Sequence, residues 1–164
     1  MNMKKNIGVT FGTFDLCHAG HILMFKECKE ICDYLIVGLQ SDPSGDRVYK
    51  NKPIMSIEER LEILKGIRYI DEVFVYDTEK DLYAYLDQNK DKISVRIIGG
   101  DWKGKPYTGH DLPIKMHFNT RNHGYSSSEL RQRIYQAEHI RMAPAEAINE
   151  HIDESDEVPS YAKK

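Results

Sequence analysis

Residues 7–21 read IGVTFGTFDLCHAGH, and this stretch decides the fold. The apolar run from Ile7 to Phe11 ends at a glycine, which is typical of a short buried strand. Beyond a tight turn, His18 and His21 flank an Ala-Gly step at the expected start of a helix. Free N–H groups at such a start favour phosphate, and two imidazoles on adjacent turns can donate to one group of oxygens. The stretch therefore predicts an oxyanion or phosphate site, because two unrelated surface histidines would not explain why these features coincide.

The rest of the chain repeats the alternation of strand and helix. Two Ser-x-x-Glu capping boxes, at Ser56 and Ser126, mark helix starts. Continuous apolar strands that alternate with helices indicate a parallel sheet covered on both faces. We therefore expect an α/β fold: a doubly wound, Rossmann-like parallel sheet in one domain, with ligands at the carboxyl ends of the strands. The expected strands are 7–11, 34–39, 73–76, 95–98 and about 115–118, and the expected helices are 19–32, one that begins at 56, 79–89 and 126–137.

Composition excludes several classes of protein. The chain has 164 residues, of which 40% are hydrophobic, and this is enough for one core and argues against disorder. A net charge of −3 argues against a nucleic-acid-binding protein. No apolar run approaches the roughly 18 residues of a membrane span, and the first residues do not resemble a signal peptide. Three cysteines, an odd number, suggest reduced thiols in a cytoplasmic protein.

The cysteines are expected to pack rather than to bind metal. Cys28 and Cys32 are four residues apart and so lie on one helix face, and the chain has no Cys-x-x-Cys pair. Towards the C-terminus the character of the chain changes, because residues 138–164 carry a net charge of −4. We expect a catalytic domain over 1–137 and an acidic extension over 138–164. The extension is expected to hold a short helix with Ala147, Ile148 and Ile152 inward, followed by a frayed tail.

Several ordered motifs add to the first stretch. They are GTFD at 12–15 with HAGH at 18–21, KPIM at 52–55 leading to Glu59-Arg60, RYIDEV at 68–73, GDW at 100–102, and the segment 121–128. With these motifs the chain resembles the cytidylyltransferases of the His-x-Gly-His nucleotidyltransferase superfamily, most of all those that act on glycerol 3-phosphate. The resemblance covers about residues 6–137.

The resemblance implies a reaction. The phosphate of a small phosphorylated alcohol, such as glycerol 3-phosphate, would attack the α-phosphorus of CTP in line, and pyrophosphate would leave. Catalysis would then be positioning and charge stabilisation, without a covalent enzyme intermediate. Mg²⁺ would be bound mainly through the nucleotide phosphates, so no protein metal site is expected. Relatives are often dimers, and a homodimer is compatible with the sequence.

The resemblance also implies which residues form the site. His18, His21, Lys52 and Arg121 would be catalytic. Asp15 would orient the turn rather than act as a base, because the attacking phosphate is already anionic. The residues expected to bind the nucleotide are Thr13, Phe14, Gly20, Lys50, Arg68, Gly100, Asp101, Trp102, Ser126 and Ser127. The polar loop 41–55, which holds both lysines, is expected to close over the triphosphate.

Two alternatives stay open. Gly100 stands where the glycerol-3-phosphate enzymes tend to have Asp, and sugar-phosphate adenylyltransferases also carry Gly-Gly-Asp, so ATP and a sugar phosphate are a second pair of substrates. Asn122 replaces a family Thr, which removes a hydroxyl beside Arg121. A nucleotide-binding regulatory module without turnover is the other alternative, although both histidines, Lys52 and Arg121 are retained. The spacing of His110, His117 and His123 does not suggest that they bind a ligand.

Overall fold

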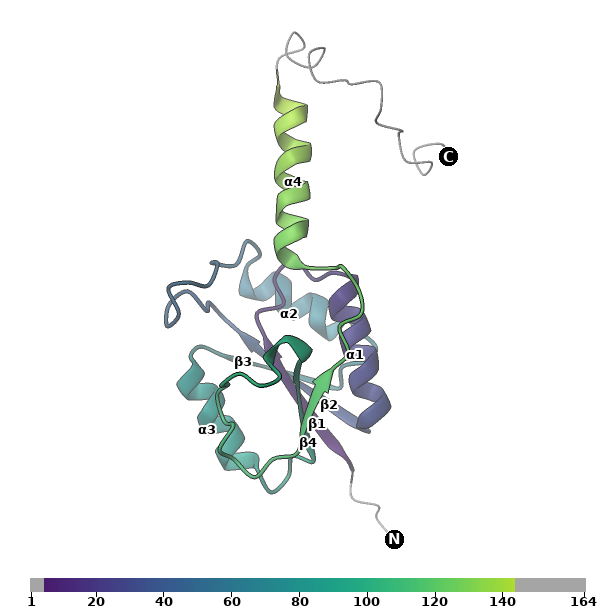
Figure 1. Cartoon of the computed structure of the whole chain (residues 1–164), viewed down its shortest axis with the longest axis vertical. Coiled ribbons are helices and arrows are strands. Elements are labelled where there is room, and N and C mark those ends of the chain that lie inside the picture. Colours follow the sequence, from purple (N-terminus) through teal and green to yellow (C-terminus); the bar gives the residue numbers. More distant parts are fainter. Residues whose placement is uncertain (1–4, 144–164) are drawn as a thin grey trace. The chain divides into compact units, whose positions relative to one another are not determined.

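The computed structural model describes residues 5–143, and Figure 1 shows their fold. Strands in this part of the chain form one parallel sheet in the order β3-β2-β1-β4-β5. Because β1 pairs with β2 on one side and β4 on the other, the strand order reverses at β1, where such folds bind ligands. The expected doubly wound sheet is confirmed. The strands are β1 (Ile7–Gly12), β2 (Tyr34–Gln40), β3 (Glu72–Tyr76), β4 (Val95–Gly99) and β5 (Met116–Asn119).

Within the described residues, three α-helices and one short 3₁₀ helix join these strands, and a fourth α-helix follows the last strand. The Ser56 capping box is confirmed, since its hydroxyl accepts from the Glu59 N–H and the Glu59 carboxylate accepts from the Ser56 N–H. Thr78 caps the next helix in the same way. The helices are α1 (Ala19–Ile31), α2 (Ile57–Lys65), α3 (Glu79–Asn89) and α4 (Ser127–Met142), and the 3₁₀ helix is η1 (Gly100–Trp102).

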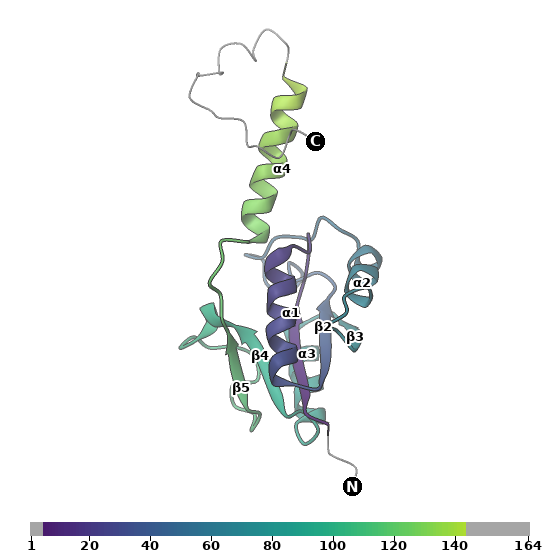
Figure 2. The same cartoon turned by 90° about the vertical axis from the view of Figure 1, so that its right-hand side faces the viewer.

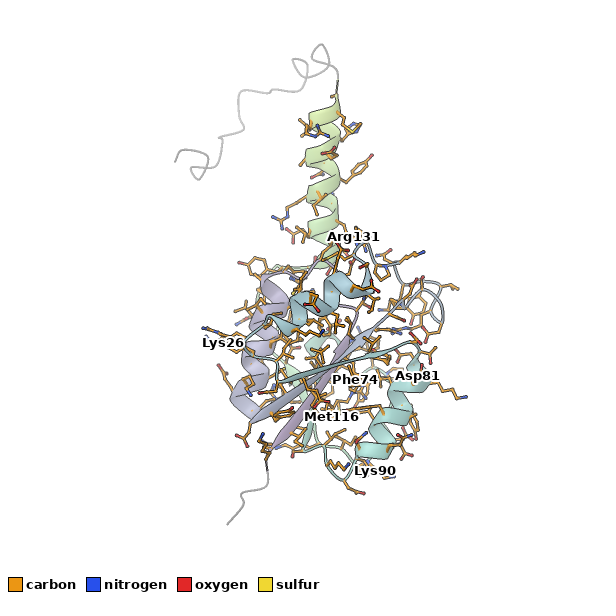
Figure 3. All side chains as sticks on the ribbon, turned by 180° about the vertical axis from the view of Figure 1, so that it is seen from behind. Lys26, Phe74, Asp81, Lys90, Met116 and Arg131 are labelled. Atoms are coloured by element: carbon orange, nitrogen blue, oxygen red, sulfur yellow. The ribbon has the colours of Figure 1, made fainter. Side chains whose placement is uncertain are left out.

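Two hydrophobic cores lie on the two faces of the sheet. Phe25 and Cys28 of α1 and Leu64 of α2 pack on one face, and in Figure 2 α1 runs along the strands. Leu82 and Leu86 of α3 pack on the other. Figure 3 shows this second layer from behind, with Phe74 of β3 labelled and with Asp81 and Lys90 marking the two ends of α3. Each face is thus covered, as the long apolar strands require.

The cysteines behave as packing residues. Cys28 and Cys32 are buried free thiols and Cys17 is half-buried. Burial raises the pKa of the Cys28 thiol well above its ordinary value. Among residues 5–143 no three His, Cys, Asp or Glu side chains are arranged to hold a metal ion.

The chain separates into two units at Ser127 and Ser128. The second begins in α4, a helix with no buried side chain that continues to Met142, five residues beyond the expected end. The boundary that we place at residue 137 stays a prediction. The short helix with Ala147, Ile148 and Ile152 and the frayed tail lie outside the described residues. Within the described part, no helix combines the length and apolarity needed to cross a membrane.

Candidate active site

The turn between β1 and α1 holds two stacked imidazoles. His18 caps α1: its Nδ1 accepts the N–H of Gly20 at 3.1 Å, and Nδ1 of His21 accepts the N–H of His18 at 3.3 Å. The ring centroids are 4.0 Å apart. Because each Nδ1 accepts from the backbone, the proton of each neutral ring is on Nε2. The turn therefore presents two Nε2–H donors at the amino end of a helix, where anions bind favourably.

Both imidazoles are kept neutral at physiological pH. Burial lowers the pKa of His21 to about 4, helped by His18, Arg121 and His123. The pKa of His18 is lowered by burial first, and then by His123 and Arg121.

A cavity of about 270 Å³ opens beside these rings. Asp101 lies in the segment after β4, whereas Arg121 and Ser126 lie between β5 and α4. Segments from the ends of three strands thus meet at the start of α1. The cavity is lined by His18, Gly20, His21, Met24, Gly99, Asp101, Asn119, Arg121, His123, Tyr125, Ser126 and Ser127.

Gly20 allows the imidazoles to approach closely. A Cβ at this position would lie 2.8 Å from Cε1 of His123 and 2.9 Å from Cε1 of His18. Real Cβ atoms essentially never come so close, so any larger residue would displace a ring. The glycine of the His-x-Gly-His motif is therefore required by the two imidazoles that lie against it.

A second cavity, of about 650 Å³, lies at the same end of the sheet on the side of α3. Thr13, Lys50 and Trp102 line it, and the Lys50 ammonium is 5.9 Å from the centroid of the Trp102 ring. Arg96 of β4 and Tyr107 line it as well. The carboxyl end of β4 thus borders both cavities, with Ile98 in the larger and Gly99 in the smaller, whereas the carboxyl end of β1 borders the larger one.

Comparison with known proteins identifies the family. A family model described as cytidylyltransferase-like matches residues 9–133. The chain belongs to the cytidylyltransferase-like family. The confirmed resemblance extends to individual relatives: glycerol-3-phosphate cytidylyltransferase of Bacillus subtilis (strain 168) is 36% identical over 133 residues, which cover 80% of this chain and 98% of the relative.

Other relatives are longer, and a solved structure shares the fold. The bifunctional protein HldE of Campylobacter concisus (strain 13826) is 33% identical over 135 residues, covering 82% of this chain but only 28% of HldE. A lipopolysaccharide core biosynthesis protein from Thermoplasma volcanium GSS1 superimposes with a TM-score of 0.51 at 20% identity, over 82% of this chain and 89% of that one. This cytidylyltransferase-like chain therefore has the expected fold.

The structure gathers most of the site residues expected from the sequence, but not all. The smaller cavity contains His18, Gly20, His21, Asp101, Arg121, Ser126 and Ser127, and the larger one Thr13, Lys50 and Trp102. Phe14 is buried beneath the histidines, 5.5 Å from the His21 ring centroid, and has a positive φ of 49°. Lys52 and Arg68 are exposed and line neither cavity. Arg68 instead donates to the Tyr69 hydroxyl.

Gly100 has a structural reason to be glycine. Its N–H donates to Oδ1 of Asn119 at 3.1 Å, and a Cβ at Gly100 would lie 2.6 Å from the backbone oxygen of Asn119. An aspartate there would require the backbone of β5 at Asn119 to move. Asn119 itself is buried at the end of β5 and lines the smaller cavity.

Arg60 and Asp15 organise the turn without lining either cavity. Arg60 is 2% exposed, and its guanidinium donates to five backbone oxygens, including those of Thr13 and Gln40 at 2.9 and 2.7 Å. The Asp15 carboxylate accepts the N–H groups of Ile54 and Met55. Three segments of chain, after β1, after β2 and before α2, are thereby fixed to one another, and Asp15 has the orienting place expected for it.

Sequence reasoning missed His123 and Arg96. His123 lines the smaller cavity with a buried Nδ1 that lacks a hydrogen-bond partner. His123 lies in the loop between β5 and α4, far in sequence from His18 and His21, so the spacing of the histidines does not predict that it joins them. Arg96 is 4% exposed in β4. A signal for it did exist, since an arginine interrupts a strand that is otherwise apolar and expected to be buried on both faces.

Proposed function

We propose that this chain transfers CMP from CTP to a small phosphorylated alcohol of the glycerol 3-phosphate kind and releases pyrophosphate. The observation that carries the proposal is the pair of Nε2–H donors on His18 and His21 at the amino end of α1. The relative from Bacillus subtilis, matched over 98% of its length, favours CTP and glycerol 3-phosphate as the substrates.

In the proposed reaction a phosphate oxygen of the acceptor forms a bond to the α-phosphorus of CTP. The bond from that phosphorus to the pyrophosphate oxygen breaks, and pyrophosphate leaves with the bonding electrons. The acceptor phosphate is an anion already, so no side chain has to remove a proton from it. What the chain must supply is alignment and stabilisation of the negative charge that develops in the transition state.

The donors available for that charge come from three segments. His18 and His21 would donate to α-phosphoryl and bridging oxygens, and Arg121 would pair with phosphate oxygens through its planar guanidinium. Lys52 would reach the same oxygens after the 41–55 loop closes, since its side chain is exposed in the open form. The hydroxyls of Ser126 and Ser127 would hold the β- and γ-phosphates.

Base recognition and metal use complete the proposal. Gly100, Asp101 and Trp102 would contact the base, and Thr13, Phe14, Gly20, Lys50 and Arg68 are proposed to support nucleotide binding. Mg²⁺ would be held mainly by phosphate oxygens, which suits a cavity rich in cationic and N–H donors with Asp101 as its carboxylate. When bound, the ion would neutralise phosphate charge.

Pyrophosphate release tests the proposal directly. The chain is incubated with Mg²⁺, one of four nucleoside triphosphates and one of several phosphorylated acceptors. We expect release only with CTP and an acceptor together, and loss of release in His18→Ala. Release with ATP and a sugar phosphate would support the adenylyltransferase alternative instead, which the tight approach of Gly100 to Asn119 favours. Nucleotide binding without release from any pair would support the regulatory module.

A further inference from the structure

Arg96 carries a buried charge that no carboxylate of the described residues pairs with. It is 4% exposed and lies on β4, the strand whose residues line both cavities. The guanidinium lies between two aromatic rings, 5.5 Å from the centroid of Phe11 and 5.4 Å from that of Tyr107. Aromatic faces attract a cation but do not replace a counter-ion, and a buried charge without one is costly. Burial accordingly lowers the pKa of Arg96.

The neighbouring arginine shows the contrast. Arg47 lines the same cavity, and its Nε is likewise buried without a hydrogen-bond partner. Its charge is nevertheless paired, because its Nη2 is 3.0 Å from the Glu79 carboxylate and also donates to Gln40. Glu79 further accepts from the Thr108 hydroxyl, so its oxygens are engaged. Glu79 is the carboxylate whose negative charge acts on Arg96, and it is already paired with Arg47.

One edge of the Arg96 guanidinium lacks a hydrogen-bond partner. Nη1 donates to the backbone oxygen of Thr108, whereas Nε is buried without a partner and Nη2 makes no hydrogen bond within residues 5–143. The Nε–Nη2 edge is the fork that binds two oxygens of a carboxylate or phosphate side by side. The structure thus holds an unpartnered fork on a buried residue that lines a cavity of about 650 Å³.

The position of Arg96 along β4 determines how far it lies from the carboxyl end of the sheet, where the proposed reaction takes place. In the sheet it is level with Val9 of β1 and Met116 of β5, three residues before Gly99. At about 3.3 Å per residue its Cα is about 10 Å from the carboxyl end of the strand. Lys50 and Trp102 line the cavity at that end, and the hydroxyl-bearing Tyr107 lies near Arg96.

We propose that Arg96 binds a second acidic group of the acceptor, so that the acceptor is a phosphorylated compound with an anion at its far end. The inference rests on the proposed nucleotidyl transfer and restricts the class of acceptor in that reaction. The phosphate at one end would attack the nucleotide near Lys50, and a carboxylate or second phosphate at the other end would pair with the Nε–Nη2 edge. Glycerol 3-phosphate, with a single anion, would leave the arginine unpaired.

Matched acceptors test this. Sorbitol 6-phosphate and 6-phosphogluconate have the same carbon chain and differ at C1, which is an alcohol in the first and a carboxylate in the second. Glycerol 3-phosphate and 3-phosphoglycerate form a shorter pair, and fructose 1,6-bisphosphate supplies a second phosphate instead. With each acceptor we would measure two quantities: pyrophosphate release in the presence of CTP, and the shift in melting temperature that the acceptor causes without CTP. Both are measured for the wild type, Arg96→Met, Arg96→Lys and the control Arg141→Met. Arg141 is an exposed arginine of α4 paired with Glu138.

The expected result is selective. In the wild type an acidic acceptor should have a KM at least about tenfold below that of its neutral partner, since a charge-assisted bidentate pair is worth that much or more. Arg96→Met should remove this difference while KM for CTP and for the neutral acceptor changes less than about twofold. Arg96→Lys should keep part of the preference, and Arg141→Met all of it. Whether the carboxylate or the second phosphate is preferred identifies the acidic group.

Two outcomes would overturn the inference. If Arg96→Met impairs neutral and acidic acceptors equally and lowers the melting temperature, Arg96 only anchors the Thr108 loop. If no acidic acceptor has a lower KM or raises the melting temperature of the wild type more than its neutral partner, the cavity does not select acids. If no pair releases pyrophosphate, the proposed function fails, yet the melting temperatures still decide whether Arg96 binds an acidic ligand.

Discussion

The carboxylate of Asp15 accepts the backbone N–H of Met55 at 2.9 Å, across forty residues of sequence. This bond fastens the turn that precedes His18 to the segment that follows Lys52. Ile54 donates to the same carboxylate, at 3.1 Å to each oxygen. The relative placement of the histidines and of the lysine loop therefore depends on one buried acid, which is 7% exposed.

Asp15→Ala should consequently affect both stability and turnover. Two backbone donors would lose a charged acceptor, and leaving such groups unsatisfied costs about 1–3 kcal/mol. We expect a decrease of that size in the free energy of unfolding, measured in urea, together with faster amide exchange at Ile54 and Met55. Asp15→Asn retains an acceptor oxygen, so its free energy of unfolding should decrease less and the two amides should exchange less rapidly than in Asp15→Ala. Unchanged exchange at the two amides in Asp15→Ala would contradict this role.

Removing either imidazole donor should reduce turnover more than nucleotide affinity. Loss of one preorganised donor to a developing charge costs on the order of 10²–10³ in kcat. We expect His18→Ala and His21→Ala each to fall by that factor, with a much smaller change in the Kd for CTP. His139→Ala is the control, because His139 lies on the exposed face of α4 and stacks on Tyr135. Near-wild-type kcat in either variant would show that the rings do not act in the transition state.

The lowered pKa of His21 should make the fold less stable in acid. In the folded chain the His21 ring is protonated only when the pH falls to about 4, whereas in the unfolded chain it is protonated near its ordinary pKa of 6.5. As pH falls from 6.5 towards 4, the unfolded state binds more protons, so the free energy of unfolding decreases by up to about 1.4 kcal/mol per pH unit from this group. Well above pH 6.5, where the ring is neutral in both states, the effect is absent. In His21→Asn, whose amide oxygen can still accept the His18 N–H, the decrease between pH 7 and 5 should be smaller, and equal slopes would rule out this origin.

Local patterns predicted the part of this structure that short stretches of chain determine. The stretch 7–21 alone was sufficient for β1, the turn and α1, because apolar runs, caps and glycines act within a few residues. Asn119 and His123 reach the cavity only through the pairing of β5 with β4, which no local pattern encodes. Arg68 lines neither cavity, since its guanidinium stacks on Tyr69, 4.9 Å from the ring centroid, and its place near the nucleotide stays a prediction.

Gly20→Ala should separate activity from stability. Alanine is favoured over glycine in a helix by about 1 kcal/mol, which opposes the cost of the close contact. The new Cβ would collide with the rings of His18 and His123, so the donors should shift while the fold persists. We expect kcat to fall at least about tenfold, since small misplacements at a reacting centre are costly, with a melting temperature close to that of the wild type. Adding His123→Ala should restore part of the activity; no recovery would place the damage elsewhere.

The 41–55 loop should close over bound nucleotide through its middle rather than as a whole. Its first part is already fixed: the Asp46 carboxylate accepts the Glu79 N–H at 2.8 Å, and Arg47 pairs with the Glu79 carboxylate at the start of α3. Its end is held by Asp15. Between these anchors Val48 and Tyr49 are 93% and 74% exposed, beside the two lysines proposed to reach the phosphates.

Hydrogen exchange can resolve these parts. On addition of CTP and Mg²⁺ we expect slower exchange at 48–52 and little change at residues 46, 47, 54 and 55, because the latter are already tied to α3 and Asp15. Lys50→Met and Lys52→Met together should abolish the slowing, since the ammonium groups are what the phosphates would attract. A control with CMP, which lacks the β- and γ-phosphates, should show a smaller effect. Uniform slowing from 41 to 55, or none at all, would mean that this loop does not close about anchors at its two ends.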